Sequence, residues 1–118
     1  MKVLLVDDDQ GTRVTLRYAL SQGGLEVHTA ASSTEALRLL SEIPFDWLLT
    51  DGDLAPEDGF KLAEKAAQLQ RGIKIVMISG SDTQEDAAGS PILRVFAKPV
   101  DPAALLSFLE TAPTQKKS

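Results

Sequence analysis

Five short apolar runs, separated by segments with helical spacing, limit what this chain can fold into. The runs lie at Val3–Val6, Glu26–Thr29, Trp47–Thr50, Ile73–Ile78 and Leu93–Ala97. Runs of this length and apolar content are typical of strands buried on both faces, as in a parallel sheet. Because strand and helix patterns alternate along the chain, the simplest architecture is a doubly wound α/β fold. Right-handed crossovers then put helices on both faces of the sheet.

The segments between the runs carry apolar residues at helical spacing. They predict helices at Thr12–Leu20, Ser33–Ile43, Phe60–Leu69 and Pro102–Leu109. Ser32 followed by Glu35 fits a capping box, and Asp101 stands as an N-cap before the first-turn Pro102. The segment Gly80–Pro91 has few apolar residues, so we expect at most a short fourth helix there.

Length and composition indicate a single soluble domain. The chain has 118 residues, and we expect a domain over residues 1–112 followed by a polar tail over 113–118. The net charge of −5 argues against direct nucleic-acid binding, which needs clustered Lys and Arg. Cysteine is absent, which excludes disulfides and thiolate sites. We find no membrane-spanning run and no signal peptide, so a cytoplasmic location is the expectation.

Polar residues follow the predicted strands at the points where those strands end. They are Asp7-Asp8-Asp9, Asp51-Gly52-Asp53, Ser79-Gly80 and Lys98-Pro99. The carboxyl ends of parallel strands meet at one edge of the sheet, where ligands bind. The fold therefore predicts that carboxylates, a hydroxyl and an ammonium group come together from distant segments. Taken singly, each of these residues could be an ordinary loop residue, helix cap or surface charge.

The combined set favours phosphoryl chemistry. Crowded carboxylates repel one another unless protons or a cation neutralise them, and oxygen-only ligands select a hard cation such as Mg²⁺. The cation and Lys98 would attract a phosphoryl group, and Ser79 could donate a hydrogen bond to it. A neighbouring carboxylate could act as the nucleophile and form an aspartyl-phosphate.

The order and spacing of these pieces resemble the receiver domain of two-component response regulators. The resemblance covers Lys2 to about Glu110. The matching pieces are Val3-Leu4-Leu5-Val6-Asp7-Asp8-Asp9, Leu48-Leu49-Thr50-Asp51, Asp58-Gly59, Val76-Met77-Ile78-Ser79-Gly80 and Ala97-Lys98-Pro99. The resemblance implies five parallel strands in the order 2-1-3-4-5. It also implies a phospho-acceptor signalling domain rather than an enzyme that turns over an external substrate.

The resemblance also implies a metal site and an acceptor. Asp51 matches the phospho-acceptor, which would also ligate Mg²⁺. Asp8 matches the acid that binds the metal directly, and Asp7 matches the neighbour that acts through water. The backbone carbonyl of Asp53 would supply a further ligand.

Two further residues match groups that contact the phosphoryl oxygens. Ser79 stands where the family has Thr or Ser, and Lys98 matches the family's lysine. The Lys98-Pro99 bond matches one that is commonly cis. The implied phosphodonor is a histidine kinase or a histidine phosphotransfer protein, and the downstream target is an unidentified protein.

Three departures from the family pattern bear on signal output. The family's proline four residues after the acceptor is Ala55 here, and Pro56 follows one place later. The usual aromatic residue three places before the lysine is Val95. Phe96 is adjacent, but neighbours on a strand point to opposite faces, so it does not substitute. The stretch Gly80–Pro91 is shorter than the family's fourth-helix region.

An enzyme is the strongest alternative. Asp51 and Asp53 after a strand, followed later by a serine and a lysine, also resemble a phosphatase of the haloacid-dehalogenase type. The second aspartate would then act as general acid or base. The acids Asp7-Asp8-Asp9 precede the nucleophile, however, and only Asp101 follows the lysine closely, which disfavours that family.

Two non-enzymatic alternatives remain. A flavodoxin-like cofactor binder would need a phosphate-cradling loop after the first strand, where Asp7-Asp8-Asp9 would repel a phosphate. A receiver-like module that binds partners without phosphorylation is favoured by Val95 and the short Gly80–Pro91 segment. Among the remaining residues we expect a core position for Trp47, a surface or packing position for His28, and solvent-facing positions for the three helix arginines, Arg13, Arg17 and Arg38.

Overall fold

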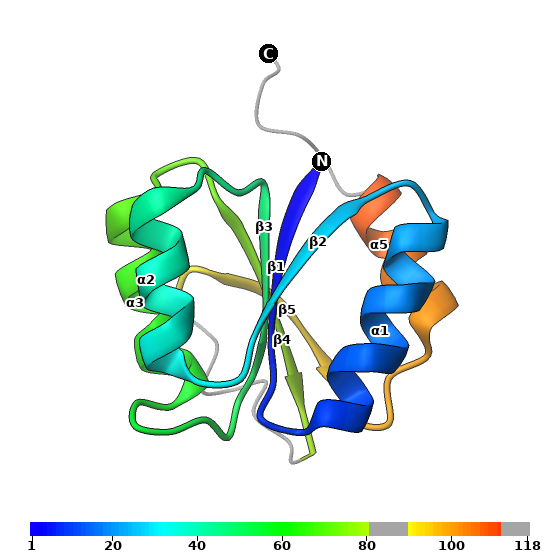
Figure 1. Cartoon of the computed structure of the whole chain (residues 1–118), viewed down its shortest axis with the longest axis horizontal. Coiled ribbons are helices and arrows are strands. Elements are labelled where there is room, and N and C mark those ends of the chain that lie inside the picture. The colour runs from blue at the N-terminus through cyan, green and yellow to red at the C-terminus, as the bar shows by residue number, and fades with distance from the viewer. Residues whose placement is uncertain (81–89, 112–118) are drawn as a thin grey trace.

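A five-stranded parallel sheet forms the centre of the protein. The computed structural model describes residues 1–80 and 90–111. The strands are β1 (Lys2–Val6), β2 (Glu26–Ala30), β3 (Trp47–Asp51), β4 (Lys74–Ser79) and β5 (Ile92–Ala97). Their order is β2-β1-β3-β4-β5, and every neighbouring pair is parallel (Figure 1). This confirms the predicted strand order.

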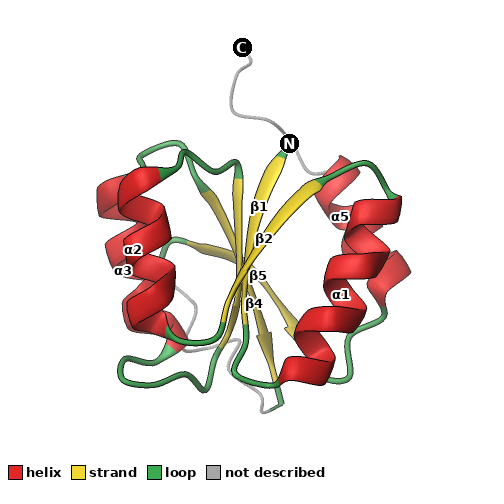
Figure 2. Cartoon of the chain, in the orientation of Figure 1, coloured by secondary structure: helices red, strands yellow, loops and turns green. Residues whose placement is uncertain are grey.

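Helices cover both faces of the sheet. They are α1 (Gln10–Gln22), α2 (Ser33–Glu42), α3 (Gly59–Leu69) and α5 (Pro102–Thr111). In Figures 1 and 2, α2 and α3 lie together on one side of the sheet, and α1 and α5 lie together on the other. The predicted short helix between β4 and β5 falls largely on residues 81–89, outside the described residues. Within the described residues, each helix is too short or too polar to span a membrane.

The helix boundaries follow from local capping. The Ser32 hydroxyl accepts a hydrogen bond from the Glu35 N–H at 3.1 Å, as predicted. The Asp101 carboxylate accepts one from Ala103 N–H at 3.0 Å. The helix α1 begins two residues earlier than the pattern predicted, since the Asp9 carboxylate accepts from the backbone N–H of Thr12 at 2.8 Å. An N-cap carboxylate of this kind stabilises a helix by about 1 kcal/mol.

Two separate cores lie on the two faces of the sheet. One packs β-strand side chains against α2 and α3 and includes Leu62 and Val95. The other packs against α1 and α5 and includes Leu20 and the fully buried Trp47. Each large side chain removed from water contributes about 1.5–3 kcal/mol of hydrophobic free energy. Trp47 is therefore a core residue, as predicted.

An irregularity in β5 explains how its side chains divide between the cores. Ile75 of β4 pairs with Ile92, but the next residue, Val76, pairs with Arg94, so β5 bulges at Leu93. The strand β5 begins at Ile92, one residue before the predicted start, and Leu93 at the bulge is 55% exposed. Val95 then faces the α2 and α3 side, whereas Phe96 packs on the α1 and α5 side. The two residues point to opposite faces, as the sequence predicted.

Candidate functional site

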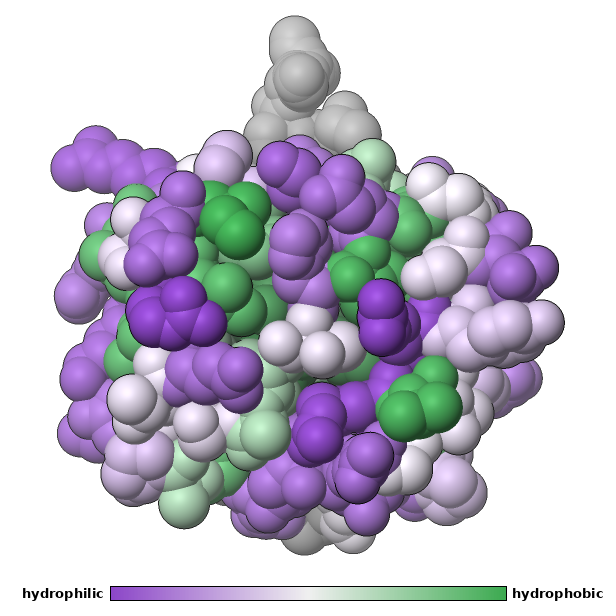
Figure 3. All heavy atoms as spheres, viewed as in Figure 1, coloured by the Kyte–Doolittle hydropathy of each residue, from purple (hydrophilic) through white to green (hydrophobic). Residues whose placement is uncertain are grey.

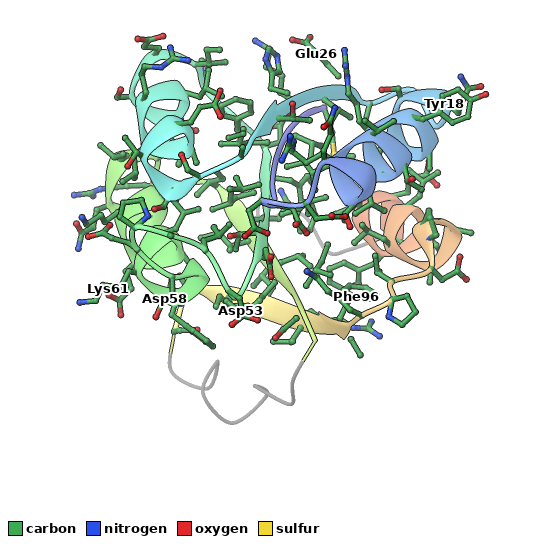
Figure 4. All side chains as sticks on the ribbon, turned by 60° about the horizontal axis from the view of Figure 1, so that its bottom comes forward. Tyr18, Glu26, Asp53, Asp58, Lys61 and Phe96 are labelled. Atoms are coloured by element: carbon green, nitrogen blue, oxygen red, sulfur yellow. The ribbon has the colours of Figure 1, made fainter. Side chains whose placement is uncertain are left out.

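The polar residues that follow the strands gather at the carboxyl edge of the sheet. Asp7 follows β1, Asp51 ends β3, Ser79 ends β4 and Lys98 follows β5. Figure 4 looks toward this edge, with Asp53 on the loop after β3 and Asp58 at the start of α3. The structure therefore brings together the acids, the hydroxyl and the ammonium group that the sequence singled out.

Asp51 is the central carboxylate of this edge. It is only 3% exposed. Its Oδ1 accepts a hydrogen bond from the Asp53 backbone N–H at 3.1 Å, and its Oδ2 lies 3.2 Å from Lys98 Nζ. Burial raises the pKa of Asp51 above its ordinary value, and the charge of Asp7 adds to the rise, although the Asp53 N–H and Lys98 oppose it. Asp51 is thus a buried carboxylate whose two oxygens have different partners.

Lys98 supplies positive charge to two buried acids. Its Nζ lies 3.2 Å from Asp51 Oδ2 and 3.4 Å from Asp7 Oδ2. Burial alone would lower the pKa of Lys98, but the attraction of Asp51 and Asp7 outweighs it and leaves the pKa raised. The backbone N–H of Lys98 donates to the Ser79 carbonyl at 2.9 Å, which ties the end of β5 to the end of β4. The Lys98-Pro99 bond is cis, as the resemblance implied.

Three carboxylates at this edge can act together as metal ligands. One oxygen each from Asp7, Asp8 and Asp51 lie within 4.8 Å of one another. Asp7 and Asp51 are buried and Asp8 is exposed, so the group opens to solvent on one side. Mg²⁺ binds oxygens at about 2.0–2.1 Å and keeps several waters, which suits a group of three carboxylates that is open to solvent on one side. The donor set fits Mg²⁺, while the Asp53 carbonyl as a further ligand stays a prediction.

The Ser79 hydroxyl lies beside the acceptor loop. Ser79 is 1% exposed. A Cβ atom built on Gly52 would lie 3.3 Å from Ser79 Oγ and 3.3 Å from Met77 Sδ. Because Gly52 has no side chain, Ser79 can pack directly against the backbone of Gly52, the residue that follows Asp51.

The loop between β3 and α3 is held at both ends by contacts that the sequence analysis did not identify. A Cβ atom on Gly59 would lie 2.3 Å from the Asp51 carbonyl oxygen, and the Gly59 N–H donates to the Gly52 carbonyl at 3.1 Å. Ser33, fully buried at the start of α2, donates its N–H to the Ala55 carbonyl at 3.2 Å. The Ser33 hydroxyl accepts from the Glu57 N–H at 3.0 Å. The Asp58-Gly59 pair was the only sequence signal for this arrangement.

Arg13 is only partly exposed, whereas the sequence predicted a solvent-facing position. Its Nη1 donates a hydrogen bond to the Asp7 backbone carbonyl at 2.7 Å, and the residue is half-buried. Arg17 and Arg38 are exposed as expected, and Arg38 forms a surface ion pair with Glu42 at 3.4 Å. His28 packs edge-on against Phe45 and hydrogen-bonds Glu26 at 2.8 Å, which fits its predicted packing role.

A pocket of about 600 Å³ opens beside the site, between α1 and the loop from β5 to α5. Its lining is Asp9, Gly11, Thr12, Thr15, Leu16, Ile78, Lys98, Pro99, Val100 and Pro102. Val14 and Tyr18 are exposed on α1, at 59% and 68%. The face shown in Figure 3 carries many hydrophilic side chains with small apolar patches between them. Asp9 and Lys98 are the charged residues of the pocket lining, and the other lining residues are uncharged.

Comparison with known proteins finds a family that matches nearly the whole chain. Residues 3–110 match the response regulator receiver domain family. The transcriptional regulatory protein GlrR of Escherichia coli is 32% identical over 113 residues, which cover 93% of this chain and 26% of that protein. The chain thus spans about a quarter of the length of that relative.

Solved structures show the same fold. A CheY-like receiver domain protein from Methanospirillum hungatei has a TM-score of 0.87 and 30% identity, covering 92% of this chain and 90% of that one. A response regulator from Burkholderia pseudomallei, solved with a phosphorylated aspartic acid, a calcium ion and citrate, has a TM-score of 0.83 and 26% identity, covering 93% and 66%. With its strand order and the acids at its carboxyl edge, the chain belongs to the response regulator receiver domain family of two-component signalling.

Proposed function

We propose that this chain is a phosphorylatable switch in which Asp51 accepts a phosphoryl group from a phosphohistidine, with Mg²⁺ as cofactor. The observation that carries the proposal is the arrangement around Asp51, a buried carboxylate with Lys98 3.2 Å from one oxygen and two further acids beside it. A purely structural ion pair would need only one acid for one lysine. The surplus carboxylates call for a second positive charge, which a divalent cation would supply.

The reaction is an in-line displacement at phosphorus. A carboxylate oxygen of Asp51 forms the new O–P bond while the N–P bond to the donor imidazole breaks, and the electron pair of that bond returns to the imidazole nitrogen. Asp7, Asp8 and Asp51 would hold Mg²⁺, whose charge would neutralise the incoming phosphoryl oxygens. Since the chain contributes little bond-making beyond the nucleophile, its work is positioning and charge neutralisation.

Lys98 and Ser79 act on the transferred group. Lys98 Nζ already lies within 3.4 Å of both buried carboxylates. When Asp51 becomes an acyl phosphate, its carboxylate loses its negative charge. The nearest new negative charge is on the phosphoryl oxygens, so Lys98 pairs with one of them. The Ser79 hydroxyl, beside Gly52, donates a hydrogen bond to another.

The donor reaches Asp51 along α1. This helix presents Val14 and Tyr18 to solvent next to the pocket that Lys98 lines. A helix of a histidine kinase or histidine phosphotransfer protein packing there would bring its phosphohistidine over the acceptor edge. The phosphorylated aspartic acid and bound calcium in the related Burkholderia structure support the proposed chemistry at the same kind of domain.

The experiment is intact-protein mass spectrometry after incubation with acetyl phosphate, with and without Mg²⁺, beside an Asp51→Asn variant. We expect one phosphoryl adduct on the wild type, dependent on Mg²⁺ and absent from the variant. Release of free phosphate from generic esters over many turnovers would point instead to a phosphatase. An inert protein would leave an interaction module that needs no phosphorylation.

The interaction module is the second candidate because of Val95. This residue is 7% exposed and packs in the core beneath α2 and α3. The position therefore has no aromatic ring whose rotation could be coupled to a movement of the Ser79 hydroxyl. Hydrogen exchange separates the two candidates. If phosphorylation changes the exchange of β5 and α5, the switch is favoured, whereas unchanged exchange together with partner binding by Asp51→Asn favours the module.

A further inference from the structure

We propose that Arg13 is a positioning residue for the metal site and that it sets the affinity for Mg²⁺ by holding the peptide between Asp7 and Asp8. The proposal rests on the function proposed above. It starts from the hydrogen bond of 2.7 Å that Arg13 Nη1 donates to the Asp7 carbonyl. That carbonyl belongs to the peptide group joining the two acids, so fixing its oxygen fixes the plane from which Asp8 projects.

Asp7 itself is held by several contacts. Its N–H donates to the Ala30 carbonyl at 3.1 Å, and its Oδ1 accepts from the Asp9 N–H at 2.8 Å. Its Oδ2 lies 3.4 Å from Lys98 Nζ. With the Arg13 contact, both ends of the residue and its carboxylate are fixed.

Asp8 has no such support of its own. It is exposed, and its side chain makes no hydrogen bond or ion pair with any described residue. Its carboxylate nevertheless has an oxygen within 4.8 Å of ligand oxygens on Asp7 and Asp51. The direction of the Asp8 side chain therefore depends on its backbone. The Arg13 hydrogen bond holds the peptide before Asp8, and the bond from Asp9 N–H to Asp7 Oδ1 holds the peptide after it.

Arginine suits this role better than lysine. The guanidinium is planar and presents its N–H groups in a fixed fork, so one hydrogen bond also orients the donor. It spans the distance from the first turns of α1 back to the end of β1, because the Asp9 cap brings the start of α1 close to Asp7. A lysine at this position would keep the positive charge but would lack the planar fork of N–H donors.

Charge and positioning make opposite predictions for the variants. A positive group near a cation site repels the cation, so neutralising Arg13 would tighten Mg²⁺ binding if charge alone mattered. Loss of an outer-shell hydrogen bond that orients ligands typically weakens metal binding by about 10–100-fold. The sign of the change in affinity therefore tells the two effects apart.

The test is calorimetric titration of Mg²⁺ into the whole chain, for the wild type and for Arg13→Gln, Arg13→Lys, Arg17→Gln and Asp8→Asn. Arg17 lies one turn further along α1 and is exposed, so it is the matched control for loss of charge. We expect Arg13→Gln to weaken binding by about tenfold or more, and Arg13→Lys to weaken it although the charge is kept. Arg17→Gln should stay within about twofold of the wild type.

A second readout separates positioning from catalysis. At saturating Mg²⁺ the phosphorylation rate of Arg13→Gln should return to within about threefold of the wild-type rate, a difference of about 0.7 kcal/mol, while its half-saturating Mg²⁺ concentration stays raised. Thermal unfolding in EDTA checks that the variants are folded. If Arg13→Gln is not folded, the Mg²⁺ affinity of Arg13→Lys still tests the positioning role.

Three outcomes would overturn the inference. If the wild type binds no Mg²⁺ at millimolar concentration, or if Asp8→Asn binds it as the wild type does, the proposed metal site fails and the inference fails with it. If the wild type binds and Asp8→Asn does not, yet Arg13→Gln binds as tightly as the wild type or more tightly, the metal site stands and the role of Arg13 is refuted.

Discussion

Replacing Gly59 by alanine should destabilise the protein and disturb the acceptor, although alanine is the better helix former. The added Cβ would lie 2.3 Å from the Asp51 carbonyl oxygen and 3.0 Å from the Gly52 Cα. An ordinary carbon–oxygen contact is about 3.3 Å or longer, so the start of α3 would have to move by about 1 Å. Both atoms in the way are backbone, which cannot rotate aside as a side chain can.

The magnitude follows from three contributions. Overpacking against a rigid neighbour destabilises by about 1–3 kcal/mol. Moving α3 also weakens the 3.1 Å hydrogen bond from Gly59 N–H to the Gly52 carbonyl, which contributes about 1 kcal/mol. The helix propensity of alanine returns at most about 1 kcal/mol. We therefore expect a net loss of roughly 1–3 kcal/mol and a fall in Tm on the order of 10 °C.

Urea unfolding followed by fluorescence measures this loss directly. Trp47 is the single tryptophan and is fully buried, so unfolding changes its emission. Gly11→Ala is the matched control because Gly11 also lies in the first turn of a helix. Its Cβ would meet Asp9 Oδ2 at an ordinary 3.5 Å, and we expect it to stabilise by up to about 1 kcal/mol. If Gly59→Ala is as stable as the wild type and accepts phosphate at the same rate, the close approach of α3 has no structural importance.

Further predictions concern the charges of the site. Burial raises the pKa of Asp51, so the ionised carboxylate lowers the stability of the folded protein at pH values above that pKa. Asp51→Asn should therefore raise Tm at pH 7 in EDTA, and a lower Tm would contradict this. The same raised pKa means that Mg²⁺ affinity, measured by calorimetry from pH 7 downward, should begin to fall at a higher pH than for an exposed aspartate. Lys98→Met leaves two buried carboxylates without their ammonium partner and should lose about 1–3 kcal/mol in urea unfolding without metal, an effect that saturating Mg²⁺ should largely reverse. Asp53→Asn should change the dephosphorylation rate, since the exposed Asp53 stands two residues after the acceptor; an unchanged rate would remove Asp53 from the mechanism.

The elements that could be predicted are those whose burial is indicated by a continuous apolar run in the sequence. The run Trp47–Thr50 became β3, Trp47–Asp51, because all five of its residues are buried and no charged residue interrupts it before Asp51. The site was predictable for a related reason. Once the strands are parallel, the residues that follow them must meet at one edge, whatever lies between them in the chain.

The features that could not be predicted depend on distances between elements. Arg13 and Arg17 are the same residue type on one helix, and only the fold shows that Arg13 reaches the Asp7 carbonyl. The hydrogen bond between Ser33 and Glu57 joins residues 24 apart, with no pattern in either segment to signal it. The bulge in β5 at Leu93 leaves the apolar run intact and shifts only the pairing with β4.

The position of Lys98 directly after β5 has a consequence for protein synthesis. Asp7 and Asp51 leave the ribosome well before Lys98, and β5 pairs only with β4 within the described sheet. Until β5 has been made and has joined that edge, the nascent chain carries the acids of the site without the ammonium group that lies between them. The proposed phosphotransfer therefore requires that synthesis has passed Lys98 and that β5 has joined the sheet beside β4.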